Sequence, residues 1–260
     1  MSDRAELTAD EEISMRHLTH YLGHYDKYLI VPETLNINRA GFHLARFGAP
    51  YFGSVAANTR LMLSREFYER FQNYEYILIY HLDSLVFSDQ LEAWCDTGLD
   101  YIGPPWVPTE DTPWVKEPGV GNGGFCLRKV SSCLKVLYSE HYALPPDEYW
   151  QRVQRKRPSP WHWFYWPNKI WKYVRRYNGV QWEVGRYKRN EDQFWGNRAQ
   201  HYYPNFKIAD VDHALQFAFE GEPRISFEKL GRQLPFGCHA WPKFDREFWE
   251  PHLISSFELQ

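Results

Sequence analysis

The stretch Tyr76–Phe87, YILIYHLDSLVF, decides how the rest of the sequence is interpreted. Its first five residues are apolar or aromatic, which is typical of a short buried strand in an α/β protein. Asp83 follows this run closely, and His81 lies two positions before it. A carboxylate beside so apolar a run is costly to bury unless a partner compensates its charge. The stretch therefore predicts a strand that delivers an acid to the edge of a sheet.

This position of Asp83 suits a ligand site. In open α/β sheets, ligands bind beyond the carboxyl ends of the strands. In an ideal strand, His81 and Asp83 point to the same side, and an imidazole with a carboxylate could hold a divalent metal. The residues alone leave a second interpretation open, in which Asp83 is a hydrated turn aspartate beside a histidine packed on tyrosines.

Composition excludes several classes of protein. The chain has 260 residues, 18% of them aromatic, and a formal charge of −3, which is unlike a disordered chain. No run reaches the ~18–20 apolar residues of a membrane-spanning helix, and the opening MSDRAELTADEE lacks the basic and apolar regions of a signal peptide. The four cysteines form no CxxC pair. We therefore expect reduced thiols in a cytoplasmic protein.

Short apolar runs alternate with helical patterns along the chain. A capping box at Thr8 and Glu11 predicts a helix start, and Ser64 can cap the helix REFYERF. Further helices are expected from Ser88 to about Gly98 and over 130–138, and strands at 27–32, 49–55, 76–82, 100–106 and 125–129. This alternation favours one α/β domain over 1–260, with a mostly parallel sheet flanked by helices.

Residues 145–190 form a basic, Trp-rich insertion. They hold eleven Lys or Arg, three Asp or Glu, and six of the twelve tryptophans. Within them, Ile170, Trp171, Val174 and Tyr177 fall on one face of a predicted helix. Such a helix can lie on an anionic membrane surface or bind an anionic acceptor. A flap packed on the main domain fits equally well, whereas nucleic acid is a less favoured partner.

Three further motifs contain residue types that carry chemistry. GVGNGGFCLR has three glycines and Asn122 within Gly121–Gly124, which lets the backbone approach a ligand or simply forms a loop before a strand. In NEDQFW, either Glu191 or Asp192 could cap a helix while the other acid points outward. His239 in FGCHAW is either a metal ligand or a packed core histidine.

The order of these motifs is more specific than any one of them. NYEYILIYHLDSLVF, DYIGPPW, GVGNGGFCLRKV, NEDQFW, FAFE and LPFGCHAW together resemble a family of bacterial glycosyltransferase-like domains of the GT-A type, over roughly residues 10–250. The resemblance implies a GT-A-like, Rossmann-like fold. It also implies transfer of a sugar from a nucleotide-diphosphate sugar to a glycan or lipid-linked acceptor, as in polysaccharide biosynthesis.

The resemblance also implies roles for individual residues. Asp83, with His81 in place of the family's first acid and His239 near the C-terminus, would hold Mn²⁺ or Mg²⁺ on the donor diphosphate. Asp192, with Glu191 as the second choice, would be the base of an inverting enzyme. The donor and acceptor pocket would be shaped by Gly121, Asn122, Gly123, Gly124 and Trp106. The protein would work in the cytoplasm, with the insertion reaching the inner face of the membrane.

The family usually opens with a strand that precedes the one matching 27–32. In this sequence a polar segment and a helix stand there instead, so that strand is either further upstream or lost. Two alternatives follow from the departures. One is a catalytically degenerate GT-A-like module that binds a glycan or a membrane. The other is a metal-dependent hydrolase that uses His81, Asp83 and His239.

Overall fold

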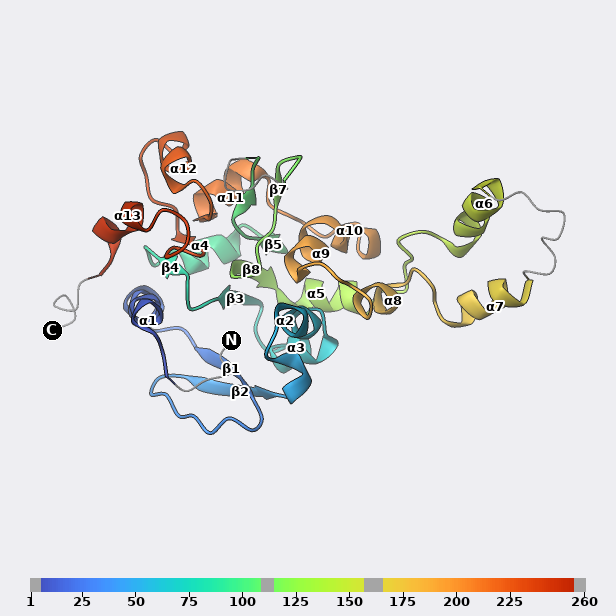
Figure 1. Ribbon diagram of the computed structural model, residues 1–260, viewed down its shortest axis with the longest axis horizontal. Helices are drawn as coiled ribbons and strands as arrows, with labels where there is room; N and C mark the ends of the chain where they lie inside the picture. The colour runs from blue at the N-terminus through green and yellow to red at the C-terminus, as the bar shows by residue number, and fades with distance from the viewer. Residues whose placement is uncertain (1–5, 109–114, 157–165, 255–260) are drawn as a thin grey trace.

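Figure 1 shows a computed structural model of the protein, in which residues 6–108, 115–156 and 166–254 are described. The ends of the chain and the middle of the Trp-rich insertion, 157–165, lie outside these residues. The described helices are α1 (Ala9–Leu22), α2 (Val55–Met62), α3 (Arg65–Arg70), α4 (Leu91–Asp96), α5 (Val130–Leu137), α6 (Pro146–Lys156), α7 (Trp166–Val174), α8 (Val180–Val184), α9 (Glu191–Asn197), α10 (Ala199–Tyr202), α11 (Val211–Phe217), α12 (Pro223–Lys229) and α13 (Arg246–Trp249), with 3-10 turns η1 (Ala49–Tyr51) and η3 (Glu250–His252).

The described strands form small sheets in which most neighbours are antiparallel. They are β1 (Tyr28–Pro32) with β2 (His43–Phe47), β3 (Tyr76–Tyr80) with β8 (Phe125–Lys129) and β5 (Tyr101–Ile102), β4 (Leu85–Val86) with β10 (Gly237–Cys238) and β9 (Ala218–Phe219), and β6 (Pro105–Trp106) with β7 (Gly119–Val120). Among the named strands, β1–β2 and β9–β10 are the parallel pairs. The chain is thus a mixed α/β protein.

The sequence predicts a mostly parallel sheet, but the described sheets are small and mostly antiparallel. The central strand β8 lies between β3 and β5 and runs antiparallel to both, with Ile79 opposite Cys126 and Ile102 opposite Leu127. Alternation of strands and helices gives the order of the elements, but it does not give the direction in which a strand returns. Here the chain enters β8 from β7 through the glycine loop, and β8 then runs antiparallel to both β3 and β5.

Local signals at two of the predicted helix starts are confirmed, whereas the helix expected from Ser88 begins only at Leu91, with no side-chain cap bond from Gln90. The Thr8 side chain accepts a hydrogen bond from the Glu11 backbone N–H, and the Thr8 N–H donates to the Glu11 carboxylate at 2.8 Å. The Ser64 hydroxyl accepts from the Phe67 N–H at the start of α3. Each cap satisfies backbone donors that have no partner within the helix.

The strand predicted at 49–55 is wrong. Residues Ala49–Tyr51 form a 3-10 turn with Pro50 in its first turn, and the Ser54 side chain caps α2 by accepting from the Ala57 N–H. The actual strand, β2, comes earlier and reads HLARF. Ala45 and Phe47 are buried while Leu44 and Arg46 are half-buried, which is the period-two burial of a strand with one face on the core. A proline and a helix cap therefore outweigh the β-propensity of Tyr51 and Phe52.

Two apolar clusters make the core. The larger one contains residues of β3 and β8, among them Phe125 and Leu127, together with Trp195 of α9. The smaller one contains Trp241 and Trp249 together with Phe219 of β9 and Cys238 of β10. The cysteines are unpaired and buried or half-buried, as the sequence indicated. All five residues of β3 remain partly exposed, although the sequence predicted a buried strand.

The insertion forms an arm. Helices α6 and α7 extend away from the remainder of the described chain, and α8 marks the return (Figure 1). Lys172 of α7 lies over the rings of Tyr149 and Tyr177, so the arm has a small aromatic and cationic core. The sequence places Tyr177 on the apolar face of this helix, but α7 ends at Val174 and Tyr177 lies beyond it. No described helix is long and apolar enough to cross a bilayer.

Candidate metal centre and neighbouring acid

Three strand ends bring His239, Asp83 and Glu220 together. In the β4–β10 pair, Cys238 lies opposite Leu85, so His239 just after β10 lies beside the residues just before β4. In the β9–β10 pair, Cys238 lies beside Phe219, which places Glu220 on the other side of His239. The His239 N–H donates to the Phe219 carbonyl at 2.9 Å. Short pairings between distant parts of the chain therefore build the site.

The His239 ring lies between two carboxylates. Its Nδ1 is 2.9 Å from the Glu220 Oε1, and its Nε2 is 3.4 Å from the Asp83 Oδ1. Burial disfavours the charge on His239, but the hydrogen bonds with Asp83 and Glu220 outweigh burial and raise its pKa to about 9. The histidine thus binds a proton at neutral pH, between two acids that neutralise it.

His81 completes the cluster from the end of β3. Residues 81–83 lie in a turn and not in the strand, because the Ser84 N–H donates back to the His81 carbonyl at 3.0 Å. The His81 N–H donates to the Gly124 carbonyl at 2.7 Å, and its ring lies edge-on to that of His239, with centroids 5.6 Å apart. Removal from water lowers the pKa of His81 to about 3. Its imidazole is therefore neutral, the form that binds metals.

These residues fit a divalent cation. One ligand atom each from His81, Asp83 and His239 lies within 4.8 Å of the others. Two imidazole nitrogens and one carboxylate oxygen form a donor set that suits Mn²⁺, Fe²⁺ or Zn²⁺ better than Mg²⁺, which prefers oxygen. Glu220 holds the far nitrogen of His239, as carboxylates do behind metal-bound histidines. A cation here would replace the proton that His239 otherwise binds.

The glycine loop brings the backbone against these side chains. A Cβ at Gly124 would lie 2.0 Å from the His239 Nε2, and a Cβ at Gly123 would lie 2.0 Å from the Glu191 Oε1. Asn122 is buried with a φ of 110°, and its Oδ1 accepts from the Gly124 N–H at 2.7 Å. The backbone of Gly123 and Gly124 therefore lies between Glu191 on one side and His239 on the other. It separates the candidate metal cluster (His81, Asp83 and His239) from the acid pair (Glu191 and Asp192).

Trp106 covers the near end of this loop. It lies on β6 opposite Gly119 of β7, and a Cβ at Gly121 would lie 2.0 Å from its ring. The ring is half-buried. Trp106 and the glycine loop are thus in contact, and their role as the wall of a donor and acceptor pocket stays a prediction.

The two acids of NEDQFW have different surroundings, and neither points outward. Glu191 is 3% exposed and accepts two hydrogen bonds, at 3.0 and 3.1 Å, from the fully buried guanidinium of Arg128. Arg128 also donates to the Tyr68 hydroxyl at 2.8 Å. Glu191 is therefore one half of a buried ion pair that fixes α9 to β8. The helix cap expected from one of these acids is absent, since the residue at the cap, Asn190, makes no side-chain cap bond.

Asp192 is the acid with an unusual proton affinity. It is buried, and burial together with the neighbouring charge of Glu191 raises its pKa to about 7; the charge of Glu220 adds to the shift. Its Oδ1 accepts from the adjacent Gln193 N–H at 2.7 Å. Because Glu220 also bonds to His239, Asp192 and the metal cluster are electrostatic neighbours. A carboxyl with a pKa near neutrality can accept and release protons under ordinary conditions.

Sequence reasoning missed two participants, Glu220 and Arg128. Glu220 ends the FAFE motif, and the only signal for its role is an acid directly after a short apolar strand. Arg128 directly follows the apolar residues Phe125–Leu127 of the strand, and a charge buried there needs a buried partner because an unpaired buried charge is prohibitively costly.

The chain matches the family described as "Protein of unknown function (DUF5672)" over residues 41–239. Because this match spans more than half of the chain, the protein belongs to that family. The matched region contains every candidate site residue, from His81 to His239. No curated protein and no solved structure matched the chain.

Proposed function

We propose that the protein is an inverting, metal-assisted glycosyltransferase of the GT-A type, which moves a sugar from a nucleotide-diphosphate sugar to a glycan or lipid-linked acceptor. The observation that carries the proposal is that a candidate metal-binding cluster lies close to a buried pair of acids. A cluster that fits a divalent cation, His81, Asp83 and His239, lies one glycine peptide away from the acid pair that contains Asp192.

Each residue has a distinct task in this reaction. Asp192, with a pKa of about 7, takes the proton of the acceptor hydroxyl as that oxygen attacks the sugar. Glu220 fixes the orientation of the His239 ring through the bond at Nδ1. Arg128 holds Glu191, so that Asp192 is the acid left to act as base. A divalent cation held by His81, Asp83 and His239 would supply Lewis-acid stabilisation of the leaving diphosphate.

The first test measures binding. The melting temperature of the protein is followed with Mn²⁺, with nucleoside diphosphates and with both together, because a ligand of the native state raises apparent stability. We expect the metal to raise the melting temperature, and a nucleoside diphosphate to raise it further in the presence of metal. Asp83→Ala should remove both effects. Failure of every nucleotide to bind at millimolar concentration, with or without metal, contradicts the proposal.

The second test measures transfer with the donor that binds. Asp192→Asn should leave metal and donor binding intact and lower turnover by ~10²–10⁴-fold, the usual contribution of a general base. Asp212→Asn, an exposed acid on α11, is the matched control and should retain full turnover. Glycan binding that Asp192→Asn does not affect, without transfer from any donor, identifies a degenerate binding module instead.

A metal-dependent hydrolase is the second candidate, because the donor set of two histidines and one carboxylate also suits metal-activated water. Release of free sugar or phosphate in the absence of any acceptor distinguishes this activity from transfer. The reaction should then persist in Asp192→Asn if a metal-bound water supplies the nucleophile.

We also propose a partner for the arm, an anionic membrane surface at the inner face of the bilayer. Exposed apolar side chains gather on α7, namely Trp166, Ile170, Trp171, Tyr173 and Val174. Basic residues dominate the surrounding sequence, with eleven Lys or Arg in 145–190. Apolar anchors among cations are the composition of helices that lie in the headgroup region. The arm would hold the protein beside a lipid-linked acceptor.

A further inference from the structure

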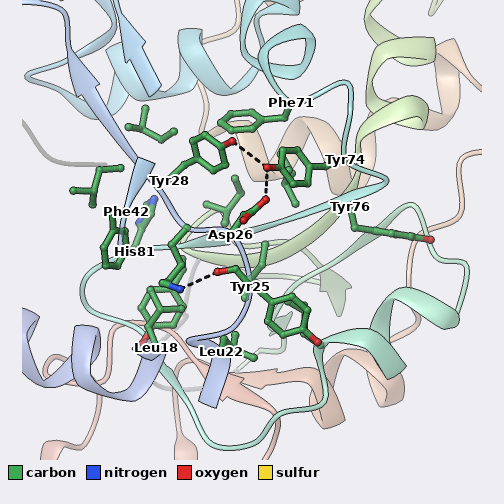
Figure 2. A pocket seen from close by; sticks show the side chains of 18 of the residues that line it. Leu18, Leu22, Tyr25, Asp26, Tyr28, Phe42, Phe71, Tyr74, Tyr76 and His81 are labelled. Carbon is green, nitrogen blue, oxygen red and sulfur yellow. Dashed lines mark hydrogen bonds between the residues drawn. The ribbon is translucent and has the colours of Figure 1, made fainter. Parts of the chain in front are cut away.

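A cavity of about 490 Å³ separates β1 from β3. Residues of α1 line one side of it, and residues of α2 and α3 line the other. Figure 2 shows Leu18 and Leu22 on the side of α1 and Phe71 on the opposite side. Tyr28, Tyr74 and Asp26 are linked by hydrogen bonds at one end, while His81 lies at the carboxyl end of β3. The cavity thus lies between two strands and is covered on both sides by helices, as a central strand of a sheet would be, but no described strand occupies it.

The cavity follows the edges of both strands. Its lining includes every residue of 27–30 and of 76–82. Successive side chains of a strand point to opposite faces, so a cavity that touches all of them runs along the strand edge and not over one face. In the described chain, β1 pairs only with β2, and β3 pairs only with β8. The outer N–H and C=O groups of both strands therefore border the same space.

The lining indicates what the cavity can hold. Backbone N–H and C=O groups are strong hydrogen-bonding groups that rarely stay unpaired when buried. A small apolar molecule would cover the aliphatic side chains and leave both rows of backbone groups without partners. Asn58 of α2, which also lines the cavity, has a buried side-chain oxygen with no partner in the described chain. An occupant with its own row of amide groups can pair with the backbone groups of β1, with those of β3 and with the Asn58 side-chain oxygen.

We propose that this cavity is a slot for an extended, apolar peptide strand of about five residues, supplied by a partner polypeptide, which pairs with β1 on one edge and β3 on the other. The length follows from β1 and β3, which have five residues each. Addition of a strand to an exposed edge is a common mode of peptide recognition, and here two edges act together. A strand that pairs with β1 and β3 at once needs both of its edges free. Every described strand of this chain already uses at least one edge for a neighbour, so a second copy is a poor source.

The inference is independent of the proposed glycosyltransferase activity, but it reaches the same site. His81 follows directly after β3, and its ring lines the end of the slot. A strand paired with β3 would restrict the turn at 81–83 and thereby the position of Asp83. Filling of the slot should consequently tighten metal binding at the cluster.

The test uses the whole chain and a synthetic peptide with a Val-Ile-Val-Ile-Val core, flanked by paired lysines for solubility. Hydrogen exchange is measured by mass spectrometry with and without saturating peptide. We expect exchange in segments 28–32 and 76–80 to slow by roughly tenfold or more, as it does for amides that gain stable hydrogen bonds. Exchange in β5 and α12, which do not border the slot, should not change.

Two N-methylated peptides are the decisive controls. Successive N–H groups of a strand point to opposite edges, so methyl groups on odd or on even residues each block one edge. Both peptides should lose binding and protection. The proposal is overturned if either methylated peptide binds as tightly as the unmethylated one, or if only one of the two segments is protected. It is also overturned if a small apolar molecule binds as tightly as the peptide. Protection that grows with protein concentration in the absence of peptide assigns the slot to a second copy and also overturns it.

Discussion

Gly124 occupies a position where any side chain would collide with His239, a candidate metal ligand. A Cβ there lies 2.0 Å from the His239 Nε2, so Gly124→Ala must displace the imidazole. We expect the affinity for Mn²⁺ or Co²⁺ to fall by about 10–100-fold, the range seen when groups around a metal ligand are altered. Isothermal titration calorimetry measures the affinity.

Gly48→Ala is the matched control, because a Cβ at Gly48 meets only the Pro50 Cδ at an ordinary 3.6 Å. This variant should bind the metal like the wild type. Unchanged affinity in Gly124→Ala would show that His239 is not a ligand.

Asp192 should make stability depend on pH. Its folded pKa, about 7, lies above the ordinary value of 3.8, so the folded state binds the proton more tightly than the unfolded state does. Stability therefore falls as pH rises from about 4 to about 7. Asp192→Asn removes this loss, so its free energy of unfolding should exceed that of the wild type above pH 7, by up to a few kcal/mol, and approach it near pH 4.

Urea denaturation at pH 4.5, 6 and 8 measures this difference. Asp212→Asn, at an exposed position, should show no such trend. A variant that gains stability while losing turnover is expected where a buried acid is kept for catalysis. Equal destabilisation of Asp192→Asn at all three pH values would assign Asp192 a purely structural role.

Among the site residues, those next to clear local patterns could be predicted from the sequence. Asp83 and His81 follow an apolar run, and the glycines of 121–124 identify their loop without further context. The division of labour between Glu191 and Asp192 could not be predicted, because it depends on Arg128, which lies 63 positions before Glu191. Likewise Glu220 has a role only because β9 pairs with β10.

At the scale of elements, the arm offers a test that leaves the folded core intact. Ile170 and Val174 on α7 are 46% and 71% exposed, so Ile170→Ser with Val174→Ser should not change the melting temperature. If α7 contacts lipid, binding to vesicles that contain phosphatidylserine should fall, since each exposed aliphatic side chain contributes roughly 1–2 kcal/mol on burial. Vesicle co-sedimentation at low and high salt measures the binding.

The matched control is Ile225→Ser with Val55→Ser, whose positions are 48% and 66% exposed on α12 and α2. This pair removes the same side chains from the main body and should leave vesicle binding unchanged. Wild-type binding that is weak at low salt, or equal loss in both double variants, would argue against the arm as a lipid contact.

Elements with strong local signals could be predicted from the sequence, and their pairing could not. The caps at Thr8 and Ser64 and the runs that form β1, β3 and β8 all lie where the sequence indicates. The strand expected at 49–55 failed because Pro50 and the Ser54 cap favour helical turns there. The antiparallel direction of β8 depends on contacts between strands, which no local window of sequence contains.

At the scale of the whole molecule, the candidate metal ligands come from positions far apart in the chain. His239 reaches Asp83 only when β10 pairs with β4, which closes a loop from Val86 to Gly237. Because closing a long loop costs entropy before its contacts form, the cluster should assemble late in folding. In refolding with Co²⁺, the absorption of the bound ion should appear with the slowest protein phase. Its appearance in an early phase would contradict this order.

The cavity between β1 and β3 was not indicated by the hydrophobic pattern of either strand. The pattern YILIY predicts a strand covered on all sides, yet each of its residues remains partly exposed. Hydrophobicity indicates which residues prefer to be buried. It does not indicate whether the chain supplies a neighbour for both edges of the strand.

The pairing of β4 with β10 also has a consequence for synthesis on the ribosome. His81 and Asp83 leave the exit tunnel long before His239, and the strand that carries His239 cannot join β4 until nearly the whole chain has been translated. A partly made chain therefore holds only two of the three ligands. If the cluster binds the proposed cation, chains that include β10 should hold Co²⁺ more tightly than fragments that end before β10, and titration of the purified species with Co²⁺ measures the difference.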